Sequence, residues 1–420
     1  MPMDSPPKSS SLIEKLKSLG VKVGTSGIQP PAPKPYQGLP IEDVMDGRYR
    51  ATRRGDTFVF EQSFSPDYHH GLASLFPSSP FPLIASWAND LRIQDLPLNA
   101  FAFLDTETSG LAGGTGTYAF LVGVGRFEAG TFRLLQFFMR DPAEEPALLE
   151  ALADFLTSCS ALVTFNGKAF DIPLLQTRYT LHTTPSPFTD FAHLDLLPLA
   201  RRLWRDRLPS RALGYLEEHV LDVSRTMEDV PGYEIPYLYF DYLRTGDARP
   251  LKGVFYHNAM DVLVLAALLS HVSSVLADPF NGKVEHGLDF IALAKLFEDL
   301  GKWNEAARLY ERGLEVGVDE ADFWTAVRRL SILQKRRGDL AEAVRWWEQA
   351  AVQGHVYAHV ELAKYHEHRV RDYVEALKWT CAALELVNAL DFPPYARRHW
   401  LGDIEHRLAR LENKARSGGV

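Results

Sequence analysis

The hydrophobic pattern of the chain changes once, near residue 278, and this change constrains the fold more than any other feature. Before it, short apolar runs of strand length alternate with segments whose apolar residues recur every three or four positions. After it, strand signals vanish and a helical period continues. Two patterns in separate parts predict two folded domains, which agrees with a length of 420 residues.

Composition excludes some classes of protein. Hydrophobic residues make up 46% and charged residues 24% of the chain, enough apolar material for real cores, which excludes a globally disordered chain. The net charge of -9 disfavours a protein that coats nucleic acid through a broad basic surface. A nuclease stays compatible with it, because clustered carboxylates add negative charge that bound cations cancel.

The cysteines and the N-terminus indicate a compartment. Cys159 and Cys381 are far apart in apolar, helical-looking stretches, so neither a disulfide framework nor a thiolate metal site is expected. The first 35 residues have no apolar core long enough for a signal peptide, and no later stretch predicts a lipid-exposed span. We therefore expect a cytoplasmic protein without a membrane partner.

The N-terminal region divides into a tail and an extension. Residues 1–44 are rich in Pro, Ser and Lys and predict a flexible tail. Residues 45–97 contain the run GRYRATRRGDTFVFEQ, which alternates around a turn and predicts a hairpin, followed by surface loop to residue 86. We expect this extension to pack on the domain that follows.

Residues 98–278 have a mixed α/β order. Strands are predicted first as a group of three, and helices then alternate with a further strand. The predicted strands are 100–105, 118–127, 131–139 and 161–165, and the predicted helices are 144–157, 172–179, 196–204, 212–218 and 254–269.

Residues 284–415 contain a repeat, seen in GKWNEAARLYERGL, GDLAEAVRWWEQAA and RDYVEALKWTCAAL. Its Glu-Ala pairs recur at offsets of 37 and 33 residues, and Gly301 and Gly338 precede the first two copies, where the third has Arg371. The pattern resembles tetratricopeptide-type repeats, whose small residues let paired helices approach closely. This resemblance implies an all-α domain that binds a protein partner.

The first chemical motif is FAFLDTETSG. Side chains two apart on a strand share a face, so Asp105 and Glu107 project together, about 6.5 Å apart at their roots. Two carboxylates that end an apolar strand are costly unless a cation meets them, and a pair of Mg²⁺ or Mn²⁺ ions suits this spacing. The alternative is a polar strand end that faces water.

The second motif is ALVTFNGKAFDIPLL. It predicts a strand, a turn at Asn166, and a helix that opens near Asp171. Asp171 is either a metal ligand or an N-cap, since Pro173 in the first turn is typical of a helix start.

The third motif is VFYHNAMDVLVLAALL. Asp261 enters a helix whose following residues are almost wholly apolar, so we expect a cation or a dedicated donor near it. His257 and Asn258 share its helical face, whereas Tyr256 points elsewhere. A histidine beside a buried acid is a candidate general base, because its pKa lies near working pH.

The order of these motifs resembles the DEDD superfamily of exonucleases, which is related to polymerase proofreading domains. The segments LDTETSGLAGGTGTYAFLVGVG, HLDLLPLARRLW, PGYEIPYLYFDYLRTGD and HNAMDVL look like the bacterial YprB-type ribonuclease H-like family over residues 46–277. The resemblance implies a mixed sheet with a three-strand meander, parallel strands and flanking helices. It also implies that Asp105, Glu107, Asp171 and Asp261 bind two Mg²⁺ or Mn²⁺ ions.

The chain departs from the superfamily at the base. The superfamily has a tyrosine four residues before the last aspartate or a histidine five before it, whereas this chain has His257 and Tyr256 at those spacings. The helical-face argument favours His257, with Tyr256 as the alternative.

The resemblance implies a 3′→5′ exonuclease that acts on single-stranded DNA or RNA, although the carboxylates by themselves also allow an internal cut. A catalytically impaired nucleic-acid-binding protein, or an adaptor that works through its repeats, is the rival hypothesis. The candidate substrate-binding residues adjoin the motifs and are Thr108, Gly110, Asn166, Lys168 and Asn258.

Three further features have two interpretations each. The glycine-rich segment 110–117 either brings backbone amides to a phosphate or connects two strands. An arginine cluster at 201–211 either follows a phosphate backbone or forms a solvated helix face. The aromatic cluster Tyr233, Tyr237, Tyr239, Phe240 and Tyr242 either stacks bases or packs in a core, and core packing is the commoner role.

Overall fold

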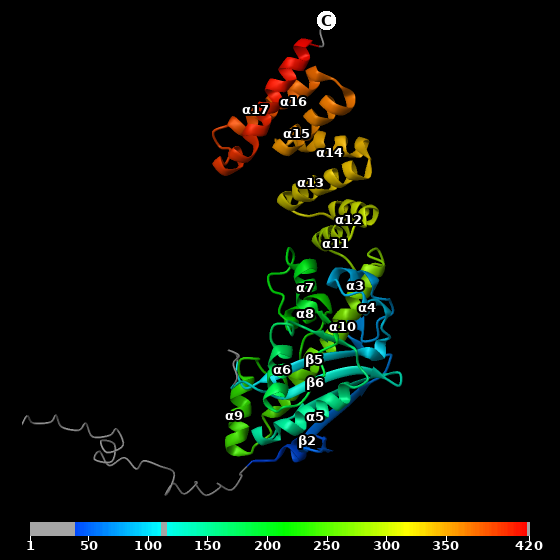
Figure 1. The fold of residues 1–420 in the computed structure, drawn as a ribbon, viewed down its shortest axis with the longest axis vertical. Helices are drawn as coiled ribbons and strands as arrows, with labels where there is room; N and C mark the ends of the chain where they lie inside the picture. The colour runs from blue at the N-terminus through cyan, green and yellow to red at the C-terminus, as the bar shows by residue number, and fades with distance from the viewer. Residues whose placement is uncertain (1–37, 111–115, 418–420) are drawn as a thin grey trace, which may run out of the picture.

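The computed structural model describes residues 38–110 and 116–417. An α/β part lies at one end of an elongated molecule, and a stack of helices extends from it to the C-terminal end (Figure 1). Most of the predicted N-terminal tail, and the middle of the glycine-rich segment, lie outside the described residues.

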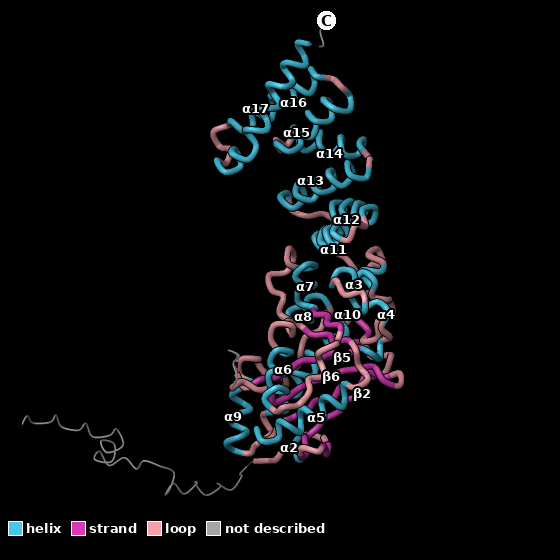
Figure 2. The backbone as a smooth tube through the Cα atoms, in the orientation of Figure 1, coloured by secondary structure: helices cyan, strands magenta, loops and turns pink. Residues whose placement is uncertain are grey.

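A seven-stranded mixed sheet forms the centre of the α/β part, in the order β1-β2-β7-β6-β5-β8-β9 (Figure 2). Strands β5, β6 and β7 form an antiparallel meander, and β8 and β9 follow β5 in parallel. This confirms the predicted meander followed by parallel strands, although β9 was not predicted: its four residues run directly into α7, and only two of them are apolar. The strands are β1 Arg48–Thr52, β2 Gly55–Phe64, β5 Phe101–Thr108, β6 Ala119–Glu128, β7 Thr131–Phe138, β8 Ala161–Thr164 and β9 Ala192–Asp195.

The predicted hairpin is part of the main sheet. Strand β2 pairs with β1 and, over seven residue pairs, with β7, so the hairpin extends the sheet beyond the meander. The sheet ladder covers an edge of the meander that would otherwise present unpaired backbone groups. The N-terminal extension thus contributes strands as well as packing.

The rest of the extension is more ordered than the predicted surface loop. It contains the short helices α3 Pro82–Ala88 and α4 Arg92–Asp95, and a small hairpin of β3 His69–His70 and β4 Ala73–Ser74. The last residues of the predicted flexible tail are ordered too, since they form the helix α2 Ile41–Val44, in which Ile41 is buried. Ile84 and Ala85 of α3 are buried. Between the prolines and serines of this stretch the apolar face of each helix is only two or three residues long. Such a short run gives no detectable helical period, so the sequence does not predict these helices.

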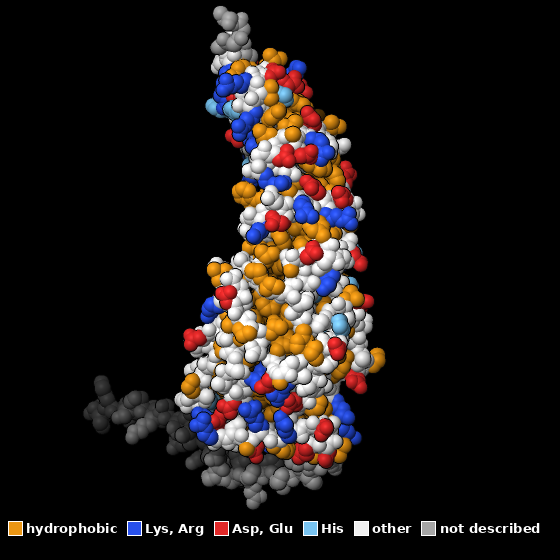
Figure 3. Space-filling view, turned by 90° about the vertical axis from the view of Figure 1, so that its right-hand side faces the viewer, with side chains coloured by type: hydrophobic (Ala, Val, Ile, Leu, Met, Phe, Trp, Pro, Cys, Tyr) orange, Lys and Arg blue, Asp and Glu red, His pale blue; other side chains and the backbone are white. Residues whose placement is uncertain are grey.

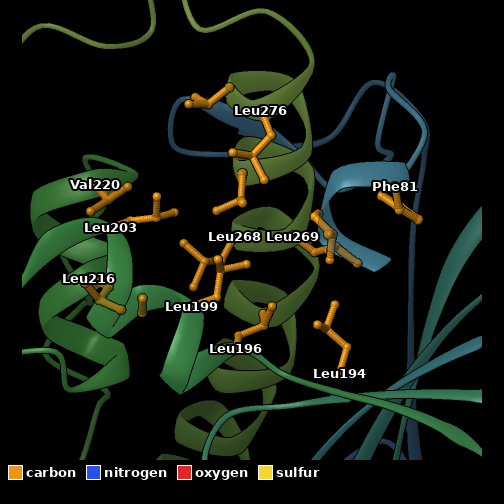
Figure 4. Packing of buried hydrophobic residues seen from close by; sticks show 14 of the residues in the cluster. Phe81, Leu194, Leu196, Leu199, Leu203, Leu216, Val220, Leu268, Leu269 and Leu276 are labelled. Carbon is orange, nitrogen blue, oxygen red and sulfur yellow. The ribbon is translucent and has the colours of Figure 1, made fainter. Parts of the chain in front are cut away.

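Helices cover both faces of the sheet. On one face lies α10 Leu251–Ala277, against which α7 Leu196–Trp204 and α8 Leu213–Val220 pack through leucines (Figure 4). On the other face lie α5 Glu145–Leu156, α6 Asp171–Leu181 and α9 Ile235–Thr245. By length and composition α10 alone among the described helices is apolar enough to cross a membrane, but 78% of its apolar window is buried inside the protein.

The C-terminal part is an array of helices in which each packs against the next. The repeated sequence motif begins the second helix of each successive pair, namely α12, α14 and α16. Gly301 and Gly338 adopt positive φ, and Arg371 adopts φ 62° at the equivalent place, so the third copy keeps the backbone turn without the glycine. The helices are α11 Gly287–Asp299, α12 Trp303–Val316, α13 Glu320–Arg337, α14 Leu340–Val352, α15 Val356–Tyr365, α16 Tyr373–Asn388 and α17 Pro394–Ser417.

The two parts share one hydrophobic core. Phe290, Leu293 and Phe297 of α11 belong to the same buried cluster as Val272 and Leu276 of α10. On the side of the molecule seen in Figure 3, hydrophobic side chains gather midway along the long axis, and charged side chains dominate towards both ends.

Two residues of the arginine cluster form ion pairs between the α/β part and the helical array. Arg207 pairs with Asp289 of α11 at 2.8 Å, and Arg202 pairs with Asp299 of the same helix. These two arginines therefore neither follow a phosphate backbone nor form a purely solvated helix face, as the sequence suggested, but join α7 to the helical array.

Candidate active site

Strand β5 brings Asp105 and Glu107 to the face of the sheet beneath α10. Phe101 and Phe103 are buried on that face, and the two-residue period of a strand places both carboxylates on the same side. Burial raises the pKa of Asp105 well above its usual range, and repulsion from Asp261, Glu107 and Asp171 raises it further. The pKa of Glu107 is raised in the same way, first by burial and then by Asp261 and Asp171.

Asp171 contacts β5 at Thr106, the residue between the two β5 carboxylates, whose side chain projects to the other face of the strand. Asp171 is the first residue of α6, one position after the N-cap residue Phe170, so the N-cap interpretation does not describe it. Instead its carboxylate accepts a hydrogen bond from the Thr106 hydroxyl. Burial raises the pKa of Asp171 to about 6, although this hydrogen bond acts in the opposite direction.

Asn258 orients Asp105 from within the core. Its side-chain amide donates to Asp105 Oδ2 at 2.9 Å, and its Oδ1 accepts from Gln136 Nε2 at 2.9 Å. The opposite strand makes room for it at Gly123, where a Cβ atom would lie 2.2 Å from Asn258 Oδ1. Because Asn258 is fully buried, it cannot contact substrate as predicted, and it acts as support for a carboxylate.

The Asn166 turn is held by Asp195. The backbone amides of Asn166 and Lys168 donate to the Asp195 carboxylate at 2.7 and 3.2 Å, and the same carboxylate caps α7 through the amide of Leu197. Asn166 adopts a left-handed φ of 67°, which asparagine tolerates better than most residues. Lys168 is exposed, which leaves its side chain accessible from solvent.

Thr108 and Gly110 lie where β5 leaves the sheet. The Thr108 hydroxyl donates to the carbonyl oxygen of Gly110 at 3.0 Å, and the pairing register shifts between Glu107 and Thr108. Bulges of this kind re-aim side chains at strand ends and recur beside active sites.

His257 lies beside Asp261 on α10 and is oriented by a second carboxylate. Its Nδ1 is 2.8 Å from Asp229 Oδ1, and its Nε2 is 3.7 Å from Asp261 Oδ2. An imidazole whose Nδ1–H donates to a carboxylate keeps Nε2 free to accept a proton. The hydroxyl of Tyr256 accepts a hydrogen bond from the backbone amide of Thr226 at 3.2 Å.

Like Asp229, Arg225 is a site residue that no sequence motif indicated. Its guanidinium pairs with Asp261 and, through Nε at 2.6 Å, with Glu217. Glu217 is buried and is held from its other side by His70 at 2.7 Å. Arg225 is thus the cation that was expected near Asp261 because of its apolar surroundings. It lies in a segment without regular secondary structure, where no periodicity could reveal it.

An open hollow of about 560 Å³ adjoins this half of the site. Arg225, Asp229, His257 and Asp261 line it, and Asp105, Glu107 and Asp171 lie outside its lining. Within residues 38–110 and 116–417, no group of three or more His, Cys, Asp or Glu side chains is arranged to hold a metal ion. The donor chemistry nevertheless fits magnesium or manganese, because carboxylate oxygens are hard ligands, and Asp171 and Asp261 lie near enough to Asp105 and Glu107 to raise the pKa of both β5 carboxylates.

Comparison with known proteins agrees with this fold. Residues 102–273, from β5 to near the end of α10, match the RNase_H superfamily. Residues 102–273 therefore form a ribonuclease H superfamily domain, a helical region follows it, and this class of domain indicates a nuclease.

A Bacillus subtilis (strain 168) protein, "Uncharacterized protein YprB", is 34% identical over 366 residues, which cover 85% of this chain and 86% of that protein. The chain belongs to the YprB family. Among solved structures, the family B DNA polymerase of Pyrobaculum calidifontis is similar at 16% identity with a TM-score of 0.33, over 49% of this chain and 29% of the polymerase chain.

Proposed function

We propose that the protein is a metal-dependent 3′→5′ exonuclease that hydrolyses phosphodiester bonds of single-stranded DNA or RNA. One observation carries the proposal: α10 and α6 both contact β5 at its carboxylates, through the hydrogen bonds from Asn258 to Asp105 and from Thr106 to Asp171, so the carboxylates of three elements gather at one strand end and raise the pKa of Asp105. Ribonuclease H superfamily nucleases generally use divalent metal ions, and such a carboxylate group is the expected ligand set.

In this proposal Asp105, Glu107, Asp171 and Asp261 hold two Mg²⁺ or Mn²⁺ ions. Bound ions would polarise the attacking water and neutralise charge that develops at the phosphate. His257 accepts the proton of that water at Nε2, while Asp229 holds the imidazole and Asn258 holds Asp105. Lys168 and the Asn166 turn approach the substrate from the α6 side.

The wider organisation also remains a proposal. We assign residues 1–44 to a tail, 45–97 to the extension, 98–278 to the nuclease domain and 284–415 to tetratricopeptide-like repeats that bind a protein partner. We place the protein in the cytoplasm, acting away from membranes.

A second candidate is a nucleic-acid-binding protein that has lost turnover. The ion pair between Arg225 and Asp261 favours it, because the guanidinium occupies one oxygen of a carboxylate assigned to metal. The two candidates differ in whether product forms.

Metal titration on labelled strands tests both. Full-length protein with Mn²⁺ or Mg²⁺ is incubated with 5′-labelled DNA and RNA strands that carry free or blocked 3′ ends. We expect stepwise shortening of free-ended strands, abolished by a chelator and by Asp105→Asn, and unchanged in the control Asp95→Asn, an exposed acid on α4. Shortening that survives Asp105→Asn contradicts the exonuclease, and metal-independent binding without product supports the second candidate.

A further inference from the structure

The aromatic residues around α9 divide into a buried and an exposed set. Tyr239 and Tyr242 are buried, whereas Tyr233, Tyr237 and Phe240 are 64%, 72% and 46% exposed. Tyr237 and Phe240 are three residues apart and lie along one side of α9, and Tyr233 lies in the turn just before the first residue of the helix, Ile235. We call these three residues the aromatic stripe.

The buried set fixes the helix that carries the stripe. The Tyr239 ring stacks on Phe120 of β6 with centroids 3.9 Å apart and planes 4° from parallel. Its hydroxyl donates to the carbonyl oxygen of Met139 at 3.1 Å. The exposed rings therefore stand on an element anchored to the sheet, so they are pre-organised for contact with a partner.

The stripe begins beside the candidate base. Gly232 precedes Tyr233, and a Cβ atom built on it would lie 4.0 Å from His257 Nε2. From there α9 runs along the outside of the α/β part (Figure 1). Across the site, Phe170 is 62% exposed and directly precedes Asp171. One exposed ring, Phe170, thus adjoins Asp171 in sequence, and another, Tyr233, follows a glycine that lies near His257 in space.

The charges around the stripe select the kind of contact. Glu234 and Asp241 flank it, and Arg244 is paired with Asp241 at 3.1 Å. These acidic residues repel phosphate groups, whereas an uncharged flat ring can stack on the exposed aromatic side chains. Every unpaired nucleobase presents a π face, and stacking on aromatic side chains tolerates any base sequence.

We propose that the aromatic stripe stacks the unpaired bases of a single strand whose end lies at the carboxylates. This inference rests on the proposed nuclease function, whose substrate is a single strand, and adds to it that the strand is recognised through its bases by the aromatic stripe. Three consequences follow: removing bases weakens binding, pairing them weakens binding, and the part of the affinity that the stripe supplies is insensitive to salt.

Binding without cleavage tests the stripe. In the Asp105→Asn background, fluorescence anisotropy measures the dissociation constant for a twelve-residue oligothymidylate and for the same strand with abasic sites near its 3′ end. We expect Tyr233→Ala with Tyr237→Ala to weaken oligothymidylate binding roughly tenfold or more at every salt concentration. Tyr237→Phe keeps the ring and should bind like the parent, as should Tyr395→Ala, an exposed tyrosine of the distant α17.

The abasic strand makes the test specific. The Asp105→Asn protein should bind the abasic strand as weakly as the variant with Tyr233→Ala and Tyr237→Ala binds oligothymidylate. The dissociation constant of that variant should be the same for the abasic strand as for oligothymidylate. Equal weakening of both strands by the alanine changes, or unchanged binding of oligothymidylate, overturns the inference.

The two proposals fail separately. If wild-type protein shortens strands and the stripe variants do so with unchanged KM, only the stripe inference is wrong. If wild-type protein forms no product while the stripe variants lose base-dependent binding, the stripe inference stands and the exonuclease proposal fails.

Discussion

Two pairs of side chains at the site show how single residues acquire roles from their neighbours. His257 is a histidine on an apolar helix, and its contact with Asp229 makes it a candidate base. Arg225 would be an uncompensated buried charge without Glu217 and Asp261. Each pair joins α10 or α8 to the irregular segment between α8 and α9.

Replacing Asp229 by asparagine should slow catalysis without weakening substrate binding. The amide cannot hold the imidazolium that forms when His257 takes a proton, so we expect kcat to fall about a hundredfold or more with KM nearly unchanged. Steady-state kinetics on a labelled strand measures this. Glu228→Gln, at the exposed neighbouring acid, is the control, and an unchanged kcat in Asp229→Asn would remove His257 from the role of base.

Replacing Glu217 by glutamine should destabilise the fold. The change leaves Arg225 and His70 facing a neutral amide in a buried place, which typically costs about 3 to 5 kcal/mol. Urea unfolding followed by circular dichroism measures the loss. Glu218→Gln alters the adjacent, exposed carboxylate and should change the unfolding free energy by less than about 0.5 kcal/mol; equal effects would show that the buried chain of ion pairs contributes little.

At the scale of elements, one buried carboxylate adds several ion pairs to the packing of the last helix. Glu367 lies in the π-helical turn His366–Val370 after α15 and accepts hydrogen bonds from Arg407, Arg410 and Lys414 of α17. Burial acts to raise its pKa, but Arg410 and Lys414 outweigh burial and hold the pKa of Glu367 at about 2. The end of the array therefore depends on the ionised form of this residue.

The helical array should lose stability in acid because of Glu367. A carboxylate whose folded pKa is depressed stabilises the folded state fully above its unfolded pKa, near 4.5, and this contribution disappears as pH falls towards 2. We expect a loss of roughly 1 to 3 kcal/mol across that window. Thermal melts of wild type and Glu367→Gln between pH 2 and pH 7 measure it, and the two proteins should converge at the acid end; a constant difference would contradict the prediction.

At the scale of the whole molecule, the α/β part and the first helices of the array behave as one packing unit. A single buried cluster runs from Phe101 of β5 through Val272 of α10 to Leu330 of α13. Two smaller clusters, of which Leu362 and Val387 are members, hold the distal helices. The predicted boundary between domains near residue 280 therefore crosses a continuous core.

Calorimetry should detect this continuity. Leu293→Ala removes a buried side chain of α11 from the shared cluster, so we expect the main transition, which includes the sheet, to lose about 2 to 5 kcal/mol. Leu362→Ala is the matched change in a distal cluster and should leave that transition in place while the end of the array melts earlier. If Leu293→Ala shifts only a separate helical transition, the two parts unfold independently.

Sequence alone determined the features that depend on local backbone geometry. A strand repeats every two residues and a helix every 3.6, so the shared face of Asp105 and Glu107, the shared face of His257 and Asp261, and most elements from β5 to α10 could be predicted. The ribonuclease H-like class could also be identified from the sequence, because each motif is a short continuous segment and the order of the motifs along the chain can be read directly.

Tertiary structure decided every contact between residues far apart in the chain. Arg225, Asp229 and His70 carry no periodic signal, and only packing places them beside Asp261, His257 and Glu217. Packing also buried Asn258, joined the hairpin to β7 and separated the two sets of tyrosines around α9. Such contacts form when apolar faces are buried together, and their partners depend on the whole arrangement of elements, which local patterns do not specify.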